Sequence, residues 1–236
     1  MRFANAEITT IDLMRHGEPQ GGRMLRGSTD HPLSDTGWQQ VTDAVMRHTV
    51  EGRPPYDAIV SSPLARCREF ALWLGEEFDL PVQVDDDLAE LHLGGWEGKT
   101  YTQVYEQEGI EQMSAFWFDP ARAAPPGGET YAELDARVSE AWRRLLANPP
   151  GYHVLVVAHL FVCNALFRQV LEQPFSNGLV MDLPYAAMSR LRHERHAMGE
   201  HIYRVGRPVS AREAVSGQRR LGHDKSNTFF GALPCR

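Results

Sequence analysis

Four short apolar runs along the chain have the pattern of β-strands. Residues 8–14 (ITTIDLM) are β-branched and mostly apolar and lead directly into Arg15 and His16, which is typical of a buried strand that ends in a loop. Residues 154–158 (VLVVA) form the most strand-like run and lead into His159. An unbroken apolar run of this kind predicts a central strand covered on both faces. Two further strands are predicted at residues 56–62 and 81–84.

Between these runs, apolar residues recur at steps of three and four, which predicts helices. The spacing of Leu64, Cys67 and Ala71 is one example. Breaks rich in glycine and proline, such as residues 123–128, separate the helical stretches. The predicted helices cover residues 37–50, 63–78, 101–118, 129–147 and 160–171.

Strands that alternate with helices predict an α/β fold, here a three-layer α/β/α sandwich with a mostly parallel sheet. A hairpin is added to it, with strands at residues 187–193 and 201–205. The chain has 236 residues, no internal repeat and no linker, so one domain is expected over residues 1–207. Residues 208–236 are polar with weak periodicity and are expected to form an extension or arm.

Composition and charge narrow the classes of partner. Hydrophobic residues make up 42% and charged residues 23%, which are values of a globular protein. The net charge of −7 argues against a nucleic-acid or anionic-membrane surface. No apolar run approaches the roughly 20 residues that span a bilayer, and none near the N-terminus has the form of a signal peptide. A cytoplasmic protein is therefore expected, and the sequence leaves a homodimer open.

Chemically distinctive residues follow each predicted strand: Arg15 and His16 follow the first, Arg66 the second, Glu90 the third and His159 the central one. The carboxyl ends of parallel strands meet at one edge of a sheet, so we expect these side chains to converge. Arginine supplies planar, always-charged donors for phosphate oxygens. A neutral imidazole can attack phosphorus and form an N–P bond that water later opens. The pattern therefore favours a site for a phosphate monoester.

Each of these residues also has a structural interpretation. An Arg-His pair after a strand often forms a structural ion pair, and an arginine on an amphipathic helix is ordinarily solvated. Glu97 rivals Glu90 as an acid, and either one can be a surface carboxylate. A histidine after a buried strand is often a hydrogen-bonded core residue.

Four sequence motifs resemble, in order, those of one known family. LMRHGEP followed by LRGSTDHPLSDTGWQQ is similar to that family's opening signature, and SSPLARC, LAELHLGGWEGKT and VVAHLF are similar to its later motifs. The resemblance extends over roughly residues 8–206. On these motifs the chain is identified as a member of the histidine phosphatase superfamily, which implies a phosphoglycerate mutase-like fold.

The resemblance also implies a role for each residue. His16 becomes the nucleophile, and Arg15, Arg66 and His159 bind the phosphate. Glu90 becomes the proton donor to the leaving alcohol and then the base for the incoming water. Neither a metal nor another cofactor is needed, and the expected partner is a small phosphorylated substrate.

The chain departs from the family at two places. Arg26 stands before Gly27, where many relatives carry glutamine or threonine, so both residues are candidates for substrate binding. An exposed arginine is the alternative. Leu160 and Phe161 follow His159 where the family usually has glycine and then glycine or asparagine. We expect a tighter or more apolar pocket edge there.

Two clusters have residue types that bind metals, yet neither has the pattern of a site. The carboxylates at residues 85–87 are consecutive and cannot easily face one ion, so a solvated turn is expected. His193, His196 and His201 are interpreted as surface residues of the hairpin, without a cysteine or carboxylate partner. The three cysteines have no CxxC spacing, which argues against a zinc site and a disulfide framework.

Hydrolysis of a small phosphorylated metabolite is the expected activity. Phosphoglycerate mutases of the family carry a longer insertion with an Arg-Arg pair, whereas residues 113–128 contain only Arg122. The short insertion and PPGGET at residues 125–130 resemble alpha-ribazole phosphatases. Residues 116–118 (FWF) either wall a pocket for a ring-bearing substrate or belong to the core.

A protein that binds a phosphorylated partner without catalysis is the alternative from another class, and the complete catalytic set argues against it. A metal-dependent phosphatase is opposed by the absence of an Asp/His ligand motif.

Overall fold

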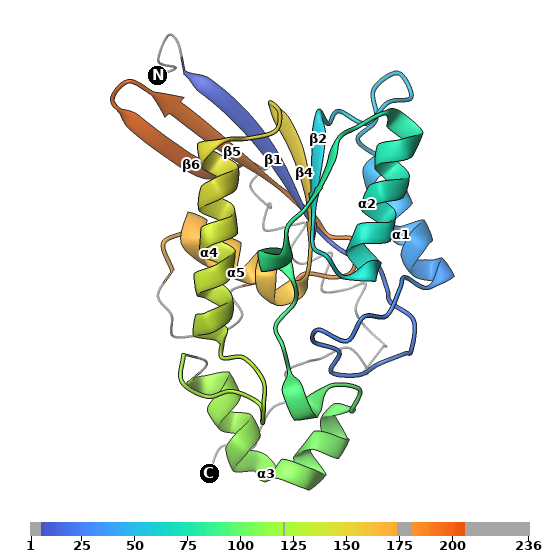
Figure 1. Cartoon of the computed structure of the whole chain (residues 1–236), viewed down its shortest axis with the longest axis vertical. Helices are drawn as coiled ribbons and strands as arrows, with labels where there is room; N and C mark the ends of the chain where they lie inside the picture. Colours follow the sequence, from blue (N-terminus) through green and yellow to red (C-terminus); the bar gives the residue numbers. More distant parts are fainter. Residues whose placement is uncertain (1–5, 120, 174–180, 206–236) are drawn as a thin grey trace, which may run out of the picture. The chain divides into compact units, whose positions relative to one another are not determined.

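The computed structural model describes residues 6–119, 121–173 and 181–205, and its central feature is a six-stranded sheet (Figure 1). The strands lie in the order β3-β2-β4-β1-β5-β6. The first four run parallel to one another, and β5 and β6 form an antiparallel hairpin beside β1. The strands are β1 (Glu7–Arg15), β2 (Ala58–Ser61), β3 (Val82–Val84), β4 (His153–Ala158), β5 (Met188–His196) and β6 (Gly199–Val205).

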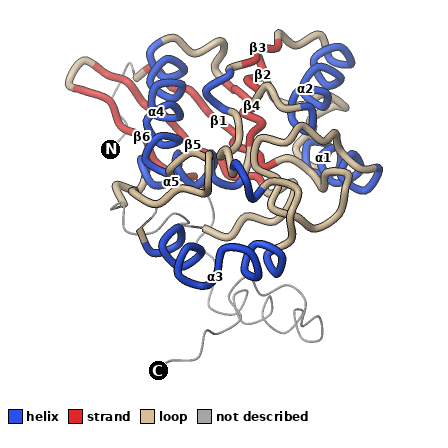
Figure 2. The backbone as a smooth tube through the Cα atoms, turned by 60° about the horizontal axis from the view of Figure 1, so that its bottom comes forward, coloured by secondary structure: helices blue, strands red, loops and turns tan. Residues whose placement is uncertain are grey.

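Helices cover both faces of this sheet, which confirms the expected α/β/α sandwich (Figures 1 and 2). One layer contains α1 (Asp35–Met46) and α2 (Ala65–Phe78), and the other contains α4 (Tyr131–Ala147) and α5 (Leu160–Val170). The helix α3 (Tyr101–Phe118) lies beyond the carboxyl ends of the parallel strands, at the bottom of Figure 1.

The central strand β4 contributes to both hydrophobic cores. Val154 and Val156 pack with residues of α4 and α5, whereas Leu155 and Val157 pack with residues of α1 and α2. All four side chains are at most 1% exposed. Because successive side chains of a strand point to opposite faces, the unbroken apolar run reflects burial on both faces, as predicted.

Two helices differ from their predictions. The first ends at Met46 rather than at Val50, and the chain then turns through Glu51 and Gly52, which have φ angles of 52° and 78°. The second, α3, is not continuous: Gly109 adopts φ 77° and ψ 172° and divides it into two helical pieces. Glycine has no Cβ and takes such a conformation without steric cost.

The hairpin forms as predicted, but one of its histidines is not on the surface. His193 is 2% exposed, and its Nε2 lies 3.0 Å from a carboxylate oxygen of Glu200. The interpretation of His193 as a surface residue without a carboxylate partner is therefore wrong. Its position follows from the period of the strand, since the alternate residues Ser189 and Leu191 are buried as well.

The carboxyl ends of the parallel strands bring the expected residues to one edge of the sheet. His16 follows β1, Ser62 follows β2 and His159 follows β4. Glu90 follows the short helix η1 (Asp86–Leu88), which comes after β3. The convergence expected from a parallel sheet is therefore present.

Two further expectations concern residues 208–236 and the absence of a membrane-spanning segment. Residues 208–236 lie outside the described residues, so the expected extension stays a prediction. Among the helices of the described ranges, none combines the length and the apolar character that crossing a membrane requires.

Candidate active site

His16 lies buried directly after β1 and is 5% exposed. Its Nδ1 lies 2.6 Å from the carbonyl oxygen of Gly17. A carbonyl oxygen can only accept, so Nδ1 carries the proton and a neutral ring has its lone pair on Nε2. Burial, followed by the charges of Arg66 and Arg15, lowers the pKa of His16 well below its usual value. The site therefore holds a neutral imidazole whose Nε2 carries an unprotonated lone pair.

Arg66 and His159 are joined by a hydrogen bond between buried side chains. Arg66 lies in the first turn of α2, is 1% exposed, and donates from Nε to His159 Nδ1 over 3.2 Å. Because a guanidinium only donates, a neutral His159 carries its proton on Nε2, which lies 2.6 Å from Ser62 Oγ. Burial and then the charge of Arg66 lower the pKa of His159 well below its usual value. Both histidines of the site are therefore neutral near pH 7.

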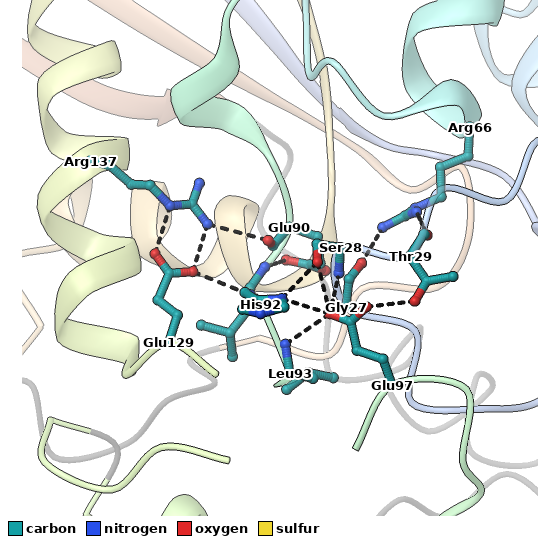
Figure 3. Close-up of polar contacts among 11 residues, drawn as sticks. Gly27, Ser28, Thr29, Arg66, Glu90, His92, Leu93, Glu97, Glu129 and Arg137 are labelled. Carbon is teal, nitrogen blue, oxygen red and sulfur yellow. Dashed lines mark hydrogen bonds and ion pairs between the residues drawn. The ribbon is translucent and has the colours of Figure 1, made fainter. Parts of the chain in front are cut away.

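The remaining contacts of Arg66 attach it to the loop that contains Gly27 (Figure 3). Its Nη1 donates to the Thr29 carbonyl over 2.9 Å and its Nη2 to the Gly27 carbonyl over 2.7 Å. These three bonds use three of the five N–H groups of a guanidinium, and no further bond of Arg66 is present within the described ranges. Position 27 requires glycine, because its φ is 53° and a Cβ atom would lie 2.3 Å from Glu97 Oε1. The alternative of a solvated Arg66 is wrong.

Arg15, at the end of β1, packs against Tyr185. The guanidinium carbon lies 4.4 Å from the centroid of the tyrosine ring, which is a cation–π contact. Nη1 donates to the carbonyl of Leu183, while Nε is buried without a hydrogen-bond partner in the described part of the chain. The Tyr185 ring also lies 5.7 Å from the His16 ring, centroid to centroid. Tyr185 therefore contacts both the candidate nucleophile and one of its cations.

Arg26 belongs to the same pocket and is 9% exposed. Its Nη2 donates to the carbonyls of Gln20 and Gly22 over 2.7 and 2.8 Å. Its charge acts on His16 together with the charges of the other two arginines. The alternative of an exposed Arg26 is therefore wrong.

Glu90 is 9% exposed and bonds to the main chain on both carboxylate oxygens. Oε1 accepts from the amide of Leu91 over 3.0 Å and Oε2 from the amide of Phe161 over 3.4 Å. Burial raises the pKa of Glu90, and the charge of Arg66 opposes that rise. A carboxyl group with a raised pKa can donate a proton and take one back near neutral pH.

The segment that carries Glu90 is held by Arg137 of α4 (Figure 3). Nη1 of Arg137 donates to the carbonyls of Asp87 and Ala89 over 2.8 and 2.7 Å, and Nη2 to that of Glu90 over 3.3 Å. An ion pair of 2.7 Å to Glu129 fixes the guanidinium from the other side. Arg137 therefore orders the main chain from which the candidate acid projects.

Glu97, the alternative to Glu90 as the acid, accepts hydrogen bonds from a neighbouring loop (Figure 3). Its Oε1 accepts from the amides of Ser28 and Leu93 over 2.8 and 3.0 Å, and its Oε2 accepts from the Thr29 hydroxyl over 2.5 Å. Burial raises the pKa of Glu97, but these hydrogen bonds outweigh burial and lower it. An ionised, fully bonded carboxylate supports the loop and leaves Glu90 as the candidate acid.

The acidic run at residues 85–87 is held by Arg144. Its guanidinium donates to Asp85 over 3.0 Å and to Asp87 over 2.8 Å, while Asp86 is exposed. The expected solvated turn is thus only partly correct. In the described ranges, no three His, Cys, Asp or Glu side chains are grouped so that they could hold a metal ion.

Comparison with known protein families identifies the family that has these residues. The model of the histidine phosphatase superfamily (branch 1) matches residues 11–203, a stretch that contains every residue of the pocket described above. The chain belongs to the histidine phosphatase superfamily. The chain is similar to the solved structure of a mycobacterial glucosyl-3-phosphoglycerate phosphatase. The two superpose with a TM-score of 0.69 and 29% sequence identity, over 84% of this chain and 97% of that one.

Proteins similar to this chain include two phosphatases that are named for different substrates. A glucosyl-3-phosphoglycerate phosphatase of Mycobacterium tuberculosis is 34% identical over 175 residues, 70% of this chain and 76% of that protein. The adenosylcobalamin/alpha-ribazole phosphatase of Salmonella typhimurium is 28% identical over 164 residues, 69% of this chain and 79% of that protein. A bifunctional protein of Mycobacterium tuberculosis is 32% identical over 171 residues, 72% of this chain but 46% of that protein. The chain thus spans about half the length of that bifunctional relative.

The departure from the family pattern at Leu160 and Phe161 lies in the first turn of α5. The Phe161 amide lies at the start of α5 and donates to Glu90. Both side chains are half-buried against the core that contains α4 and α5. The ring of Phe161 lies 6.2 Å from that of Trp117, centroid to centroid. The side chains at this point are therefore apolar and packed together, and the tighter or more apolar pocket edge stays a prediction.

Three residues of the site were missed by the sequence analysis. Ser62 belongs to the SSPLARC motif and is the last residue of a predicted strand, so its position could have indicated a role. Arg137 is a half-buried arginine on a predicted helix, where helical spacing alone gives no signal. Tyr185 lies in an aperiodic segment, and only the pairing of β5 with β1 brings it beside Arg15.

Proposed function

We propose that this histidine phosphatase is a phosphomonoester hydrolase that forms a phosphohistidine at His16. The bond from His16 Nδ1 to the Gly17 carbonyl carries this proposal. It fixes the tautomer that leaves Nε2 unprotonated, in a buried pocket where the charges of Arg15, Arg26 and Arg66 act on the ring. A neutral nucleophile surrounded by cations suits attack on a phosphate dianion.

The reaction proceeds in two steps on these residues. Arg15 and Arg66 bind the phosphoryl oxygens, and His16 Nε2 bonds to phosphorus as the ester P–O bond breaks. Glu90 gives its proton to the leaving alcohol oxygen. In the second step Glu90 takes a proton from water as the water oxygen bonds to phosphorus and the N–P bond breaks. The products are the alcohol and inorganic phosphate, and Glu90 and His16 regain their starting states.

His159 supports this chemistry by orienting a cation. Its ring centroid lies 5.1 Å from that of His16, and its two nitrogens face Arg66 and Ser62. Because Arg66 is held on one side by this ring and on the other by the Gly27 loop, the guanidinium needs little reorganisation when phosphate binds.

The substrate we propose is a small phosphorylated metabolite, with alpha-ribazole phosphate as the first candidate. The short insertion motivates that choice, and a relative is named for an alpha-ribazole phosphatase activity. Glucosyl-3-phosphoglycerate is the second candidate, because another relative is named for it and Arg26 adds a cation beyond the pair that binds phosphate. A panel containing both esters and 3-phosphoglycerate distinguishes them.

Mutase activity and binding without catalysis are less well supported. In the insertion, Arg122 has a side chain 87% exposed and lies 3.9 Å from Asp119, outside the pocket. Binding alone would not require a buried acid beside the nucleophile, yet Glu90 is present. We further propose that no metal takes part, which predicts turnover insensitive to EDTA. The cytoplasmic location and the homodimer stay predictions.

Phosphate labelling tests the proposed function. Wild-type protein quenched during turnover of a ³²P-labelled ester is expected to carry acid-labile, base-stable label, and His16→Ala is expected to carry none. His48→Ala, at an exposed histidine after α1, is the matched control and should label like the wild type. Hydrolysis by His16→Ala at a substantial fraction of the wild-type rate would rule out His16 as the nucleophile.

A further inference from the structure

Three aromatic side chains form a continuous stack beside the phosphate pocket. The ring centroids of Tyr101 and Trp117 lie 6.1 Å apart with planes 18° apart, and those of Trp117 and Phe161 lie 6.2 Å apart with planes 25° apart. All three side chains are half-buried, with one part packed on the core and another part accessible. We call Tyr101, Trp117 and Phe161 the aromatic shelf.

The two ends of the shelf are connected to two different segments of the candidate site. At one end, the Phe161 amide bonds to Glu90, the residue that protonates the leaving oxygen. At the other end, Tyr101 begins α3 two residues after Lys99, whose carbonyl accepts from the amide of Leu25 over 2.8 Å. Leu25 directly precedes Arg26. The shelf therefore lies next to the place where the alcohol part of a bound ester must emerge.

The members of the shelf pack against the hydrophobic core that contains α4 and α5. Phe116 is 3% exposed and contacts both Trp117 and Phe161 edge to face, with centroids 5.0 and 6.3 Å away. The kink at Gly109 separates the two pieces of α3 that carry the stacked Tyr101 and Trp117. Such a preformed surface binds a flat ligand without a cost for ordering itself.

We propose that the aromatic shelf is the leaving-group subsite and that it selects phosphate esters whose alcohol carries a flat ring. The inference rests on the proposed phosphatase function. Flat aromatic faces stack on rings that present a planar apolar face, whether an aromatic ring or the C–H face of a sugar. Phe118 does not take part, because it is 74% exposed and makes no ring contact with the shelf among the described contacts.

Matched esters of primary alcohols test the shelf, because they place similar demands on Glu90. Benzyl phosphate is compared with n-butyl phosphate for an aromatic ring, and glucose 6-phosphate with glycerol 3-phosphate for a sugar ring. The wild type should prefer the ring in at least one pair, measured as the ratio of kcat/KM values. Trp117→Leu keeps apolar volume but removes the flat face, and should reduce that ratio about threefold to tenfold, the range of one aromatic contact.

Two further variants make the test independent of folding defects. Phe161→Leu removes the other end of the stack while retaining the amide that bonds to Glu90, and it should reduce the same ratio. Phe118→Leu, next to Trp117 but outside the shelf, should leave the ratio unchanged. A ratio near one for both pairs in the wild type would overturn the shelf. So would a Trp117→Leu variant that changes the oligomeric state but not the ratio, since the shelf would then contact another copy.

The outcome also separates this inference from the proposed function. If the wild type hydrolyses none of the four esters and takes up no label on His16, the phosphatase function fails and the shelf fails with it. If the chain and ring esters are hydrolysed equally while His16 is labelled, only the shelf is wrong.

Discussion

Replacing Glu97 tests whether this residue supports the Gly27 loop or acts as the acid in place of Glu90. This carboxylate accepts hydrogen bonds from the amide of Leu93 and from one amide and two hydroxyls of the Gly27 loop. Two carbonyls of the same loop accept from Arg66. Glu97→Ala removes the carboxylate acceptors and leaves Glu90 in place. The variant should therefore weaken the fold locally and displace Arg66 without removing the candidate acid.

The expected magnitude follows from the two main-chain amides, of Ser28 and Leu93, that Glu97→Ala leaves unpaired. An unpaired N–H costs about 1–3 kcal/mol, less where water replaces the lost acceptor. Because Glu97 is half-buried, we expect the free energy of unfolding to fall by about 2–4 kcal/mol. In a domain of about 200 residues this lowers Tm by about 4–16 °C. Misplacement of Arg66 should lower kcat about tenfold to a hundredfold.

Glu97→Gln is the matched variant, because its carbonyl oxygen can keep the contacts of Oε1 and its amide can donate to the Thr29 hydroxyl. It should lose less than half as much stability as Glu97→Ala. Glu106→Ala, at an exposed glutamate of α3, controls for loss of a surface charge. Thermal unfolding by circular dichroism and initial rates with one ester measure both effects.

Two results would refute this reasoning. Wild-type Tm and kcat in Glu97→Ala would mean that the loop does not depend on this carboxylate. Equal and complete loss of activity in Glu97→Gln and Glu97→Ala, with Tm unchanged, would mean that Glu97 is the acid in place of Glu90.

Three further predictions follow from the same structure. Ser62→Ala leaves the Nε2–H of His159 without its acceptor and should lower the free energy of unfolding by about 1–3 kcal/mol. The same substitution should shift the imidazole ¹H–¹⁵N signals of His159, and unchanged signals would contradict the assigned tautomer. Glu90→Gln should slow alkyl phosphates far more than p-nitrophenyl phosphate, because an activated alcohol needs no proton to leave; equal losses would indicate a positioning role. Burial raises the pKa of Asp12, but bonds to Arg190 and His153 outweigh burial and lower it from 3.8 to about 2, so the folded state should lose up to about 2 kcal/mol as the pH falls from about 5 to below 2. Urea unfolding across that range should show a smaller loss of unfolding free energy in Asp12→Asn than in the wild type. Identical pH profiles would mean that Asp12 does not contribute to the loss.

The fold could be predicted largely because its strands and helices have strong periods. The run of residues 154–158 and the spacing within α2 and α4 reflect burial that local sequence already determines. The break at Gly109 was not predicted, because a glycine within a helical stretch is compatible with a continuous helix. Burial of His193 was missed for a related reason: a polar residue at an inward position of a strand is read as outward-facing unless its partner Glu200 is known.

The candidate site could be predicted where a residue directly follows a strand. His16 and His159 take their positions from the ends of β1 and β4, whose register pairs Arg15 with Ala158. Arg66 and Glu90 required the motif resemblance as well, since helical or loop position alone gave no preference over solvated side chains. Arg137 could not be predicted, because its partners are main-chain carbonyls 47 to 50 residues away.

The bond between Glu90 and the amide of Phe161 has a consequence for how this enzyme can diverge. A main-chain donor is present whichever residue occupies position 161, so mutation there can alter the shape of the entrance without depriving the carboxyl group of its partner. The proposed selection of substrates depends on the side chain of Phe161, and the proposed support of Glu90 depends on its main chain. A single substitution that exchanges the ring for a smaller or a polar group should therefore change the preferred ester while Glu90 keeps its partner.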